Sequence, residues 1–191
     1  MEAKQLWLLA GGNGAGKSTF YRTRLAPLGI PLVNADLIAK ELFPEAPEVH
    51  SYQAMQIVEQ ICDNLLHDGR SFCFETVFSH PGKVDFAGKA KALGYQIILV
   101  MIHLEPASLN KARVAQRVEE GGHDVPDEKV EARIPRLLRH IKAVIPLCDH
   151  VTLLDNSRAD NPFVRVLTIR DGLLEKMLDP LPGWAQELVD L

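Results

Sequence analysis

The chain has 191 residues, of which 47% are hydrophobic and 24% charged, and its formal net charge at pH 7 is −4. This length and composition suit a single domain, residues 1–191, with a sizeable core, and they exclude a disordered or low-complexity chain. The acidic balance also argues against a general nucleic-acid binder, which needs a broad basic face.

The first distinctive stretch is a glycine-rich segment, residues 11–19, which reads Gly-Gly-Asn-Gly-Ala-Gly-Lys-Ser-Thr. It matches the pattern G-x-x-x-x-G-K-[ST], with an apolar run suited to a strand before it (5–10) and a helix-compatible stretch after it (19–24). A strand, a glycine loop and a helix N-terminus in this order form a phosphate cradle, because backbone N–H groups converge there on one anion. The candidate nucleotide-binding residues are therefore Gly11, Gly12, Asn13, Gly14, Ala15, Gly16, Lys17, Ser18 and Thr19.

Two side chains of this segment have predicted roles of their own. Lys17 is expected to reach the β- and γ-phosphates of a nucleotide, and the hydroxyl of Ser18 is expected to ligate Mg²⁺. The alternative is a glycine-rich turn that matches the pattern by chance. The position of the segment between a strand and a helix near the N-terminus favours the nucleotide site.

The rest of the chain alternates predicted strands with predicted helices. Residues 95–104 form the most continuous apolar run and indicate a central strand covered on both faces, whereas apolar residues at helical spacing predict a helix over 51–67. Asp171-Gly172 predicts the turn of a hairpin over 164–177, so that a hairpin and a short docking helix fill about 163–191. Further strands are expected at 31–34, 71–74 and 151–154, and further helices at 36–42, 83–93, 106–120 and 127–144.

Five strand–helix units in one chain indicate a doubly wound α/β sheet, which is mostly parallel and has helices on both faces. Ligands of such sheets gather at the carboxyl ends of the strands. The residues to examine are therefore the glycine loop and the polar residues that end the other strands, namely Asp36, Glu75, His103, Glu105 and Asp155.

Asp36 is the candidate catalytic base, since it follows the strand predicted at 31–34. Phosphoryl transfer to a hydroxyl needs a carboxylate that accepts the proton of the nucleophile. The alternative is that Asp36 caps the following helix, because Asp is a favoured N-cap residue. The two roles are compatible with each other.

Glu75 and Thr76 are candidate substrate contacts at the end of the strand predicted at 71–74. The carboxylate of Glu75 could support Mg²⁺ through a bound ligand or accept hydrogen bonds from substrate hydroxyls. The alternative is a solvated acidic residue at the edge of the sheet.

A basic region at about 111–142 is the candidate lid. Two helices joined by a Gly-Gly loop could close over a triphosphate, with arginines that neutralise charge in the transition state. The alternative is an ordinary solvated helical face, and His123 in the loop is a further candidate phosphate contact. The basic residues of this region are Lys111, Arg113, Arg117, Arg133, Arg136, Arg139 and Lys142.

Several motifs in this order resemble the zeta-toxin family of P-loop kinases, and in particular its short stand-alone members. They are Gly-x-Asn-Gly-x-Gly-Lys-Ser-Thr, Asn34-Ala35-Asp36, Phe74-Glu75-Thr76, Arg117-Val118 followed by Gly-Gly-His-Asp-Val-Pro, and Asp155-Asn156-Ser157. The likeness extends from about residue 5 to residue 157.

The resemblance implies strand order 2-3-1-4-5, ATP or GTP with Mg²⁺, and phosphorylation of the 3′-hydroxyl of UDP-N-acetylglucosamine. By position it makes Lys17 and Ser18 phosphate and Mg²⁺ ligands, Asp36 the base and Glu75 a substrate contact. Arg117, Arg133 or Arg136 would hold the γ-phosphate. Larger zeta toxins generally place an arginine where this chain has Gly122-His123. The resemblance also raises an antitoxin protein as a partner.

Two other functions remain open from the sequence. One is a kinase of the same fold that acts on another sugar, a nucleoside or a polynucleotide end; the other is a nucleotide-dependent switch or binding protein that hydrolyses ATP slowly. Asp36 favours a kinase, because a switch needs no base beside a substrate hydroxyl. No apolar run approaches the roughly 20 residues of a membrane span. Cys62, Cys73 and Cys148 lack CxxC spacing, so we expect reduced thiols and a cytoplasmic protein.

Overall fold

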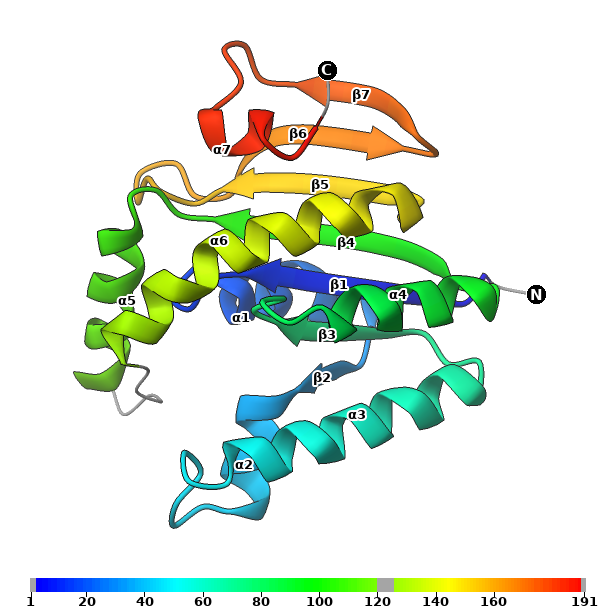
Figure 1. The fold of residues 1–191 in the computed structure, drawn as a ribbon, viewed down its shortest axis with the longest axis vertical. Helices are drawn as coiled ribbons and strands as arrows, with labels where there is room; N and C mark the ends of the chain where they lie inside the picture. Colours follow the sequence, from blue (N-terminus) through cyan, green and yellow to red (C-terminus); the bar gives the residue numbers. More distant parts are fainter. Residues whose placement is uncertain (1–2, 120–125, 190–191) are drawn as a thin grey trace.

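The computed structural model describes residues 3–119 and 126–189, which form a seven-stranded sheet with helices around it (Figure 1). The strand order is β2-β3-β1-β4-β5-β6-β7. The first five strands are parallel and the last two antiparallel, so the predicted order 2-3-1-4-5 is confirmed. The strands are β1 (Gln5–Gly11), β2 (Leu32–Asn34), β3 (Phe72–Thr76), β4 (Gln96–His103), β5 (His150–Asp155), β6 (Val164–Arg170) and β7 (Leu173–Met177).

Helices cover both faces of this sheet, as predicted. In Figure 1, α3, α4 and α6 lie on one face and α1 lies on the other. The α-helices are α1 (Lys17–Phe20), α2 (Ala35–Leu42), α3 (Ser51–His67), α4 (Gly82–Ala92), α5 (Ala107–Glu119), α6 (Asp127–Val144) and α7 (Gly183–Gln186). A π-helical turn (Tyr21–Leu25) and a 3₁₀ turn (Ala26–Leu28) continue α1, and a further 3₁₀ turn (Ile145–Leu147) continues α6.

The central strand β4 shows why its sequence is apolar throughout. Successive side chains of a strand point to opposite faces of the sheet. Ile97, Leu99 and Met101 therefore pack into the larger hydrophobic cluster, whereas Val100 and Ile102 pack into the smaller one on the other face. Because both faces are covered, every side chain between the polar ends of the strand, Gln96 and His103, is apolar.

The C-terminal part of the chain extends the sheet with the predicted hairpin. Asp171 and Gly172 both have left-handed backbones, with φ of 48° and 77°, as the two central residues of a type I′ turn require. Trp184 and Leu188 are buried in the larger cluster, so the expected docking helix is also confirmed. The hairpin lies beyond β5 and away from the carboxyl ends of β1, β2 and β3 (Figure 1).

Two local details could be settled only by the structure. The helix-compatible stretch at 19–24 is helical, but its helix begins at Lys17 and changes to a π-helical turn after Phe20. The N-cap of α2 is Asn34, whose side chain accepts a hydrogen bond from the Leu37 N–H at 3.0 Å. Asp36 lies inside the first turn of α2, so it does not cap that helix.

Within the described ranges, no helix is long and apolar enough to cross a membrane. Cys62, Cys73 and Cys148 are free and buried. Burial raises the pKa of the Cys62 and Cys148 thiols to about 12. These cysteines therefore act as small apolar core residues.

Candidate active site

A cavity of about 1010 Å³ lies where β1, β2 and β3 end. Its walls come from the glycine loop, the start of α2, the loop between β3 and α4, the helices α3, α5 and α6, and the segment after β5. Asn34 in β2 and Leu9 in β1 flank Glu75 in β3, so the parallel register brings the ends of three strands to one place. Lys17, Ser18, Asp36 and Glu75, candidates from distant parts of the sequence, therefore line a single cavity.

The glycine loop follows β1 and turns back along the edge of this cavity. Gly14 and Gly16 have φ of 75° and 97°, a conformation that side-chain-bearing residues rarely adopt. A Cβ atom at Gly16 would lie 2.6 Å from the Asn156 amide nitrogen, and one at Gly14 would lie 2.8 Å from the Asn110 carbonyl oxygen. The loop therefore needs glycine both for its backbone and for the close approach of its neighbours.

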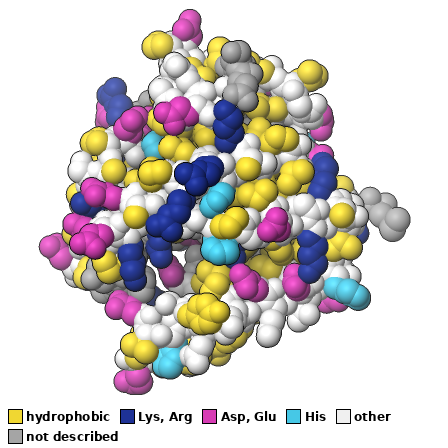
Figure 2. Space-filling view, viewed as in Figure 1, with side chains coloured by type: hydrophobic (Ala, Val, Ile, Leu, Met, Phe, Trp, Pro, Cys, Tyr) yellow, Lys and Arg dark blue, Asp and Glu magenta, His cyan; other side chains and the backbone are white. Residues whose placement is uncertain are grey.

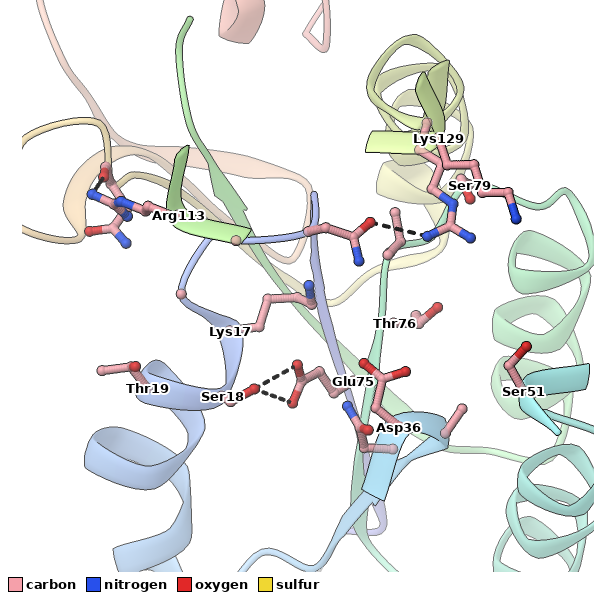
Figure 3. A pocket seen from close by; sticks show the side chains of 18 of the residues that line it. Lys17, Ser18, Thr19, Asp36, Ser51, Glu75, Thr76, Ser79, Arg113 and Lys129 are labelled. Carbon is pink, nitrogen blue, oxygen red and sulfur yellow. Dashed lines mark hydrogen bonds between the residues drawn. The ribbon is translucent and has the colours of Figure 1, made fainter. Parts of the chain in front are cut away.

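Lys17 lies at the start of α1, inside the curve of the loop. Its Nζ atom donates to the carbonyl oxygens of Gly11 and Gly12, both at 3.0 Å. These contacts hold the ammonium group at the cavity wall, where Figure 3 shows it pointing into the space above Ser18 and Glu75. A phosphate group bound by the loop would meet this positive charge first.

Ser18 and Glu75 form a hydrogen-bonded pair in the cavity. The Ser18 hydroxyl donates to the carboxylate of Glu75, at 3.1 Å from Oε1 and 3.5 Å from Oε2 (Figure 3). Glu75 lies within β3 and is only 7% exposed, which rules out the alternative of a solvated residue at the sheet edge. A buried carboxylate beside a hydroxyl offers the hard oxygen ligands that Mg²⁺ prefers. The two residues therefore fit a Mg²⁺ ion that keeps most of its waters.

Such an ion would depend on the nucleotide, because the protein offers few ligands of its own. Among the described residues no three His, Cys, Asp or Glu side chains are close enough together to hold a metal ion. Mg²⁺ is commonly bound by one or two protein groups together with substrate phosphates. Ser18 and Glu75 match that pattern.

Asp36 is exposed at the start of α2 and lines the same cavity. Its carboxylate points toward the space between Glu75 and Thr76 in Figure 3. This position follows from the N-cap of α2 at Asn34, which is the neighbour of Glu75 in the sheet. The first turn of α2, which contains Asp36, therefore begins beside the end of β3. Asp36 can therefore reach a ligand that lies across the cavity from Lys17.

The segment after β3 forms the wall of the cavity opposite the glycine loop. Phe78 has a left-handed backbone with φ of 63° and a fully buried side chain, which anchors this segment. Its N–H donates to the Thr76 hydroxyl at 3.2 Å. With Phe78 turned inward, its neighbours Val77, Ser79 and His80 line the cavity, as does Thr76. Figure 3 shows the hydroxyls of Thr76, Ser79 and Ser51 around this wall.

Lys83 and Lys129 add positive charge to the same wall. Lys83 is 8% exposed and pairs with Glu59 at 3.2 Å, between α4 and α3. Lys129 extends from α6 over Ser79 in Figure 3. In Figure 2, basic side chains gather over α6, the helix that carries Lys129, Arg133 and Arg136.

The predicted lid arginines differ in what they contact. Arg133 donates from α6 to the Asn13 side-chain oxygen at 3.1 Å and lines the cavity. Arg136 donates to the Ala132 carbonyl of its own helix and is not among the residues that line the cavity. The backbone of Arg117 lies in α5, but its side chain and His123 lie outside what the structure describes. The phosphate roles of Arg117, Arg136 and His123 stay predictions.

His103, Glu105 and Asp155, the remaining strand-end candidates, do not line the cavity. His103 is 6% exposed, and its ring packs against Trp184 with 4.5 Å between ring centroids. The Ser157 N–H donates to the Asp155 carboxylate at 2.7 Å. The contacts of His103 and Asp155 stabilise the carboxyl ends of β4 and β5.

Several cavity residues were missed by reasoning from strand ends. Lys129 lies on α6, and Ser79 and His80 lie in the segment after β3. The sequence of a helix does not show which of its polar side chains will face a cavity, because that depends on how the helix packs against the sheet. Asn156 was the one with a usable signal, because it directly follows a strand in the Asp155-Asn156-Ser157 motif.

Comparison with known proteins points to one family. A model of the zeta toxin family matches residues 1–161. An uncharacterized protein of Haemophilus influenzae is 26% identical over 140 residues, which cover 70% of this chain and 99% of that protein.

Two solved structures share the fold. A chain of the AvrRxo1-ORF1:AvrRxo1-ORF2 complex superposes with a TM-score of 0.71 at 19% identity, over 91% of this chain and 60% of that one. A chain of the PezAT chromosomal toxin-antitoxin system of Streptococcus pneumoniae superposes with a TM-score of 0.64 at 18% identity, over 86% of this chain and 72% of that one. This chain thus spans only 60% of the length of the AvrRxo1 chain.

The burial of His103 predicts a pH-dependent stability. Burial lowers the pKa of His103 from 6.5 to about 4, and the nearby Asp155 carboxylate opposes only part of that change. Between these pH values the unfolded chain binds a proton on His103 that the native chain does not, so stability should fall as the pH is lowered. The slope should reach at most about 1.4 kcal/mol per pH unit.

Urea unfolding at pH 7, 6 and 5 measures this slope. His103→Gln should make it shallower, and His67→Gln, at an exposed position, controls for the loss of a histidine. An unchanged slope in His103→Gln would show that His103 does not cause the pH dependence.

Proposed function

The chain belongs to the zeta toxin family, and from this premise we propose that it is a P-loop kinase that transfers the γ-phosphoryl group of ATP or GTP to a hydroxyl of a small molecule. One observation carries the proposal. A single cavity is lined by Lys17 and Ser18 of the glycine loop, by the Glu75 carboxylate beside Ser18, and by the Asp36 carboxylate across from Lys17. Phosphoryl transfer needs this combination of a phosphate cradle and an acid–base group beside the acceptor.

The nucleotide would bind with its phosphates in the glycine loop. The loop N–H groups and the Lys17 ammonium supply positive charge at the β- and γ-phosphates. The AvrRxo1-ORF1:AvrRxo1-ORF2 complex was also solved with ATP. A chain of that structure superposes on this chain with a TM-score of 0.63 at 18% identity. This supports the nucleotide as donor.

Ser18 would hold Mg²⁺, with the Glu75 carboxylate, which lies 3.1 Å from the Ser18 hydroxyl, as its neighbour. When bound, the ion neutralises charge on the β- and γ-phosphates. Glu75 and Thr76 would also contact the acceptor molecule. The Glu75 carboxylate would accept hydrogen bonds from its hydroxyls, and the Thr76 hydroxyl would donate one to it. Arg133, tied to Asn13 in the loop, is placed to contact the γ-phosphate from α6.

Asp36 would accept the proton of the acceptor hydroxyl. A bond forms between the acceptor oxygen and the γ-phosphorus, the bond from that phosphorus to the bridging oxygen breaks, and ADP or GDP leaves. The proton passes from the hydroxyl to the Asp36 carboxylate. Asp36 is well suited to this role because it lines the cavity without a recorded hydrogen-bond or ion-pair partner among the described residues.

The acceptor is proposed to be a polyhydroxylated molecule such as UDP-N-acetylglucosamine or another sugar nucleotide. Two carboxylates and the hydroxyls of Thr76, Ser79 and Ser51 offer many hydrogen-bond partners for sugar hydroxyls. PezAT is a toxin-antitoxin system, so an antitoxin protein is proposed as a partner. We propose a cytoplasmic site of action, where nucleotides and sugar nucleotides are available.

Replacing Lys17 with Ala tests the donor side. The variant should bind ATP at least about tenfold more weakly, because it loses the main cationic contact to the phosphates. Isothermal titration calorimetry measures the affinity, and Lys176→Ala on the exposed strand β7 is the control. Equal ATP affinity in a folded Lys17→Ala protein would contradict the nucleotide site.

Replacing Asp36 with Asn tests the acceptor side. The variant keeps the shape of the side chain but cannot accept the proton, so phosphoryl transfer should fall by about 10²-fold or more while ATP affinity changes little. A panel of sugar nucleotides, sugars and nucleosides with γ-labelled ATP identifies the acceptor used in the assay. Glu41→Gln, on the same helix, is the matched control.

Full activity in Asp36→Asn would remove Asp36 from the chemistry. If the panel then yielded no acceptor, a nucleotide-dependent switch with slow ATP hydrolysis would explain the cavity better than a kinase.

A further inference from the structure

We propose that two buried asparagines, Asn110 on α5 and Asn156 after β5, are positioning residues that aim peptide N–H groups of the glycine loop at the phosphates of the nucleotide. The proposal rests on the proposed function, because it assumes that the loop binds a nucleotide. The two asparagines are 1% and 5% exposed, so each polar side chain must find its partners inside the protein.

Both asparagines donate to carbonyl oxygens of the glycine loop. The Asn110 Nδ2 donates to the Asn13 carbonyl at 2.8 Å, and the Asn156 Nδ2 donates to the Ala15 carbonyl at 2.9 Å. A carbonyl oxygen can only accept, so the amide nitrogen and not the amide oxygen must face it. The Phe163 N–H donates to the Asn156 Oδ1 at 3.3 Å, which fixes the orientation of that amide a second time.

The direction of these carbonyls decides the direction of the neighbouring N–H groups. In a trans peptide the C=O of one residue and the N–H of the next point in opposite directions. The Asn13 carbonyl shares its peptide unit with the Gly14 N–H, and the Ala15 carbonyl shares its unit with the Gly16 N–H. Holding the two carbonyls against the asparagines therefore turns the Gly14 and Gly16 N–H groups the other way.

Those two N–H groups are available for a ligand. Gly14 and Gly16 both line the cavity, and neither N–H has an acceptor among the described residues. The Ala15 N–H between them is already used, since it donates to the Gly12 carbonyl at 3.2 Å. The Gly14 and Gly16 N–H groups are therefore the ones left for a phosphate in the cavity. They belong to the same peptide units as the carbonyls that the two asparagines hold.

Glycine makes this control necessary. Gly14 and Gly16 adopt left-handed backbones that a glycine visits freely, so a peptide unit beside either residue can rotate at little cost. A rotated unit would present its carbonyl oxygen, and not its N–H, to an anion. The asparagines remove that alternative before the nucleotide binds, and fixed dipoles need no reorganisation on binding.

Asn156 also links the loop to the helix that carries Asn110. Its backbone carbonyl accepts a hydrogen bond from the Arg113 Nη2 at 2.9 Å, and Arg113 lies one turn after Asn110 on α5. The glycine loop, α5 and the segment after β5 therefore form one hydrogen-bonded unit around the phosphate site.

Asn110→Leu and Asn156→Leu test the proposal, because leucine has a similar shape but no amide donor. Asn161→Leu, at an exposed position of the segment after β5 and outside the cavity wall, is the control. Isothermal titration calorimetry measures binding of Mg·ATP and of inorganic tripolyphosphate to each protein. Tripolyphosphate carries the phosphates without the nucleoside, so it reports on the phosphate cradle alone.

Each leucine variant should lose about tenfold or more in affinity, by the same factor for Mg·ATP and for tripolyphosphate. The control should bind both as the unchanged protein does. Unfolding midpoints without ligand show whether a variant is folded, and Asn110→Ser and Asn156→Ser replace any leucine variant that is not. Serine is too short to reach the loop carbonyl, so the same loss is expected.

Two results would overturn the proposal in different ways. If the unchanged protein binds Mg·ATP and tripolyphosphate and the folded variants bind them equally well, the asparagines do not position the loop, and the proposed kinase function stands. If the unchanged protein binds neither ligand, the proposed function fails, and the positioning role fails with it. A lower unfolding midpoint with unchanged affinity would assign the asparagines a structural role only.

Discussion

The structure depends on one constraint, which is that peptide N–H groups must face a cavity with no side chain in their way. Glycine satisfies it at Gly14 and Gly16, where a Cβ atom would also collide with α5 or with Asn156. At Gly11 a Cβ atom would lie 2.4 Å from the Ile102 carbonyl, so the loop leaves the sheet in close contact with β4. The neighbouring elements can pack this tightly only because the loop has no side chains there, and their packing in turn shapes the loop.

The same constraint explains the distribution of charge around the cavity. Positive groups lie on the loop side, where Lys17 donates to two loop carbonyls, and on α6, where Arg133 reaches Asn13. The carboxylate of Glu75 lies beside Ser18, that of Asp36 lies across the cavity from Lys17, and Lys83 and Lys129 also line the cavity. A donor rich in phosphate and an acceptor rich in hydroxyls would each meet the groups that suit them. Ser18 and Glu75 join the two sides through their hydrogen bond.

Much of the fold could be predicted from the sequence, because its signals are local. The apolar run of β4, the helical spacing of α3 and the Asp-Gly turn of the hairpin each report on their own segment, and all three were confirmed. The alternative of Asp36 as the cap of α2 could not be decided from the sequence, because Asn34 and Asp36 are both good capping residues and only the backbone shows which one precedes the helix. The burial of Glu75 could not be predicted from the sequence either, since β3 extends through Thr76, beyond the apolar residues that mark it as a strand.

The site could be predicted where its residues belong to the glycine-loop motif, follow the end of a strand or, like Arg133, lie in a basic stretch. Asp36 and Glu75 were found from strand ends, whereas Asn110 lies near the start of α5, and the placement of that helix against the loop is a tertiary property. His103 and Asp155 end strands too, but Trp184 from the far end of the chain covers His103. A strand end therefore marks a candidate, and long-range packing decides whether it reaches the cavity.

The central claim is that this cavity passes a phosphoryl group to an organic hydroxyl and not to water. The most direct measurement is the fate of the label when the protein is incubated with Mg²⁺, γ-labelled ATP and the small-molecule fraction of a bacterial extract. Chromatography separates labelled phosphate esters from labelled inorganic phosphate. The account predicts a new labelled ester that forms only when the protein is present. Label found solely in inorganic phosphate, at the rate at which ATP is consumed, would contradict it.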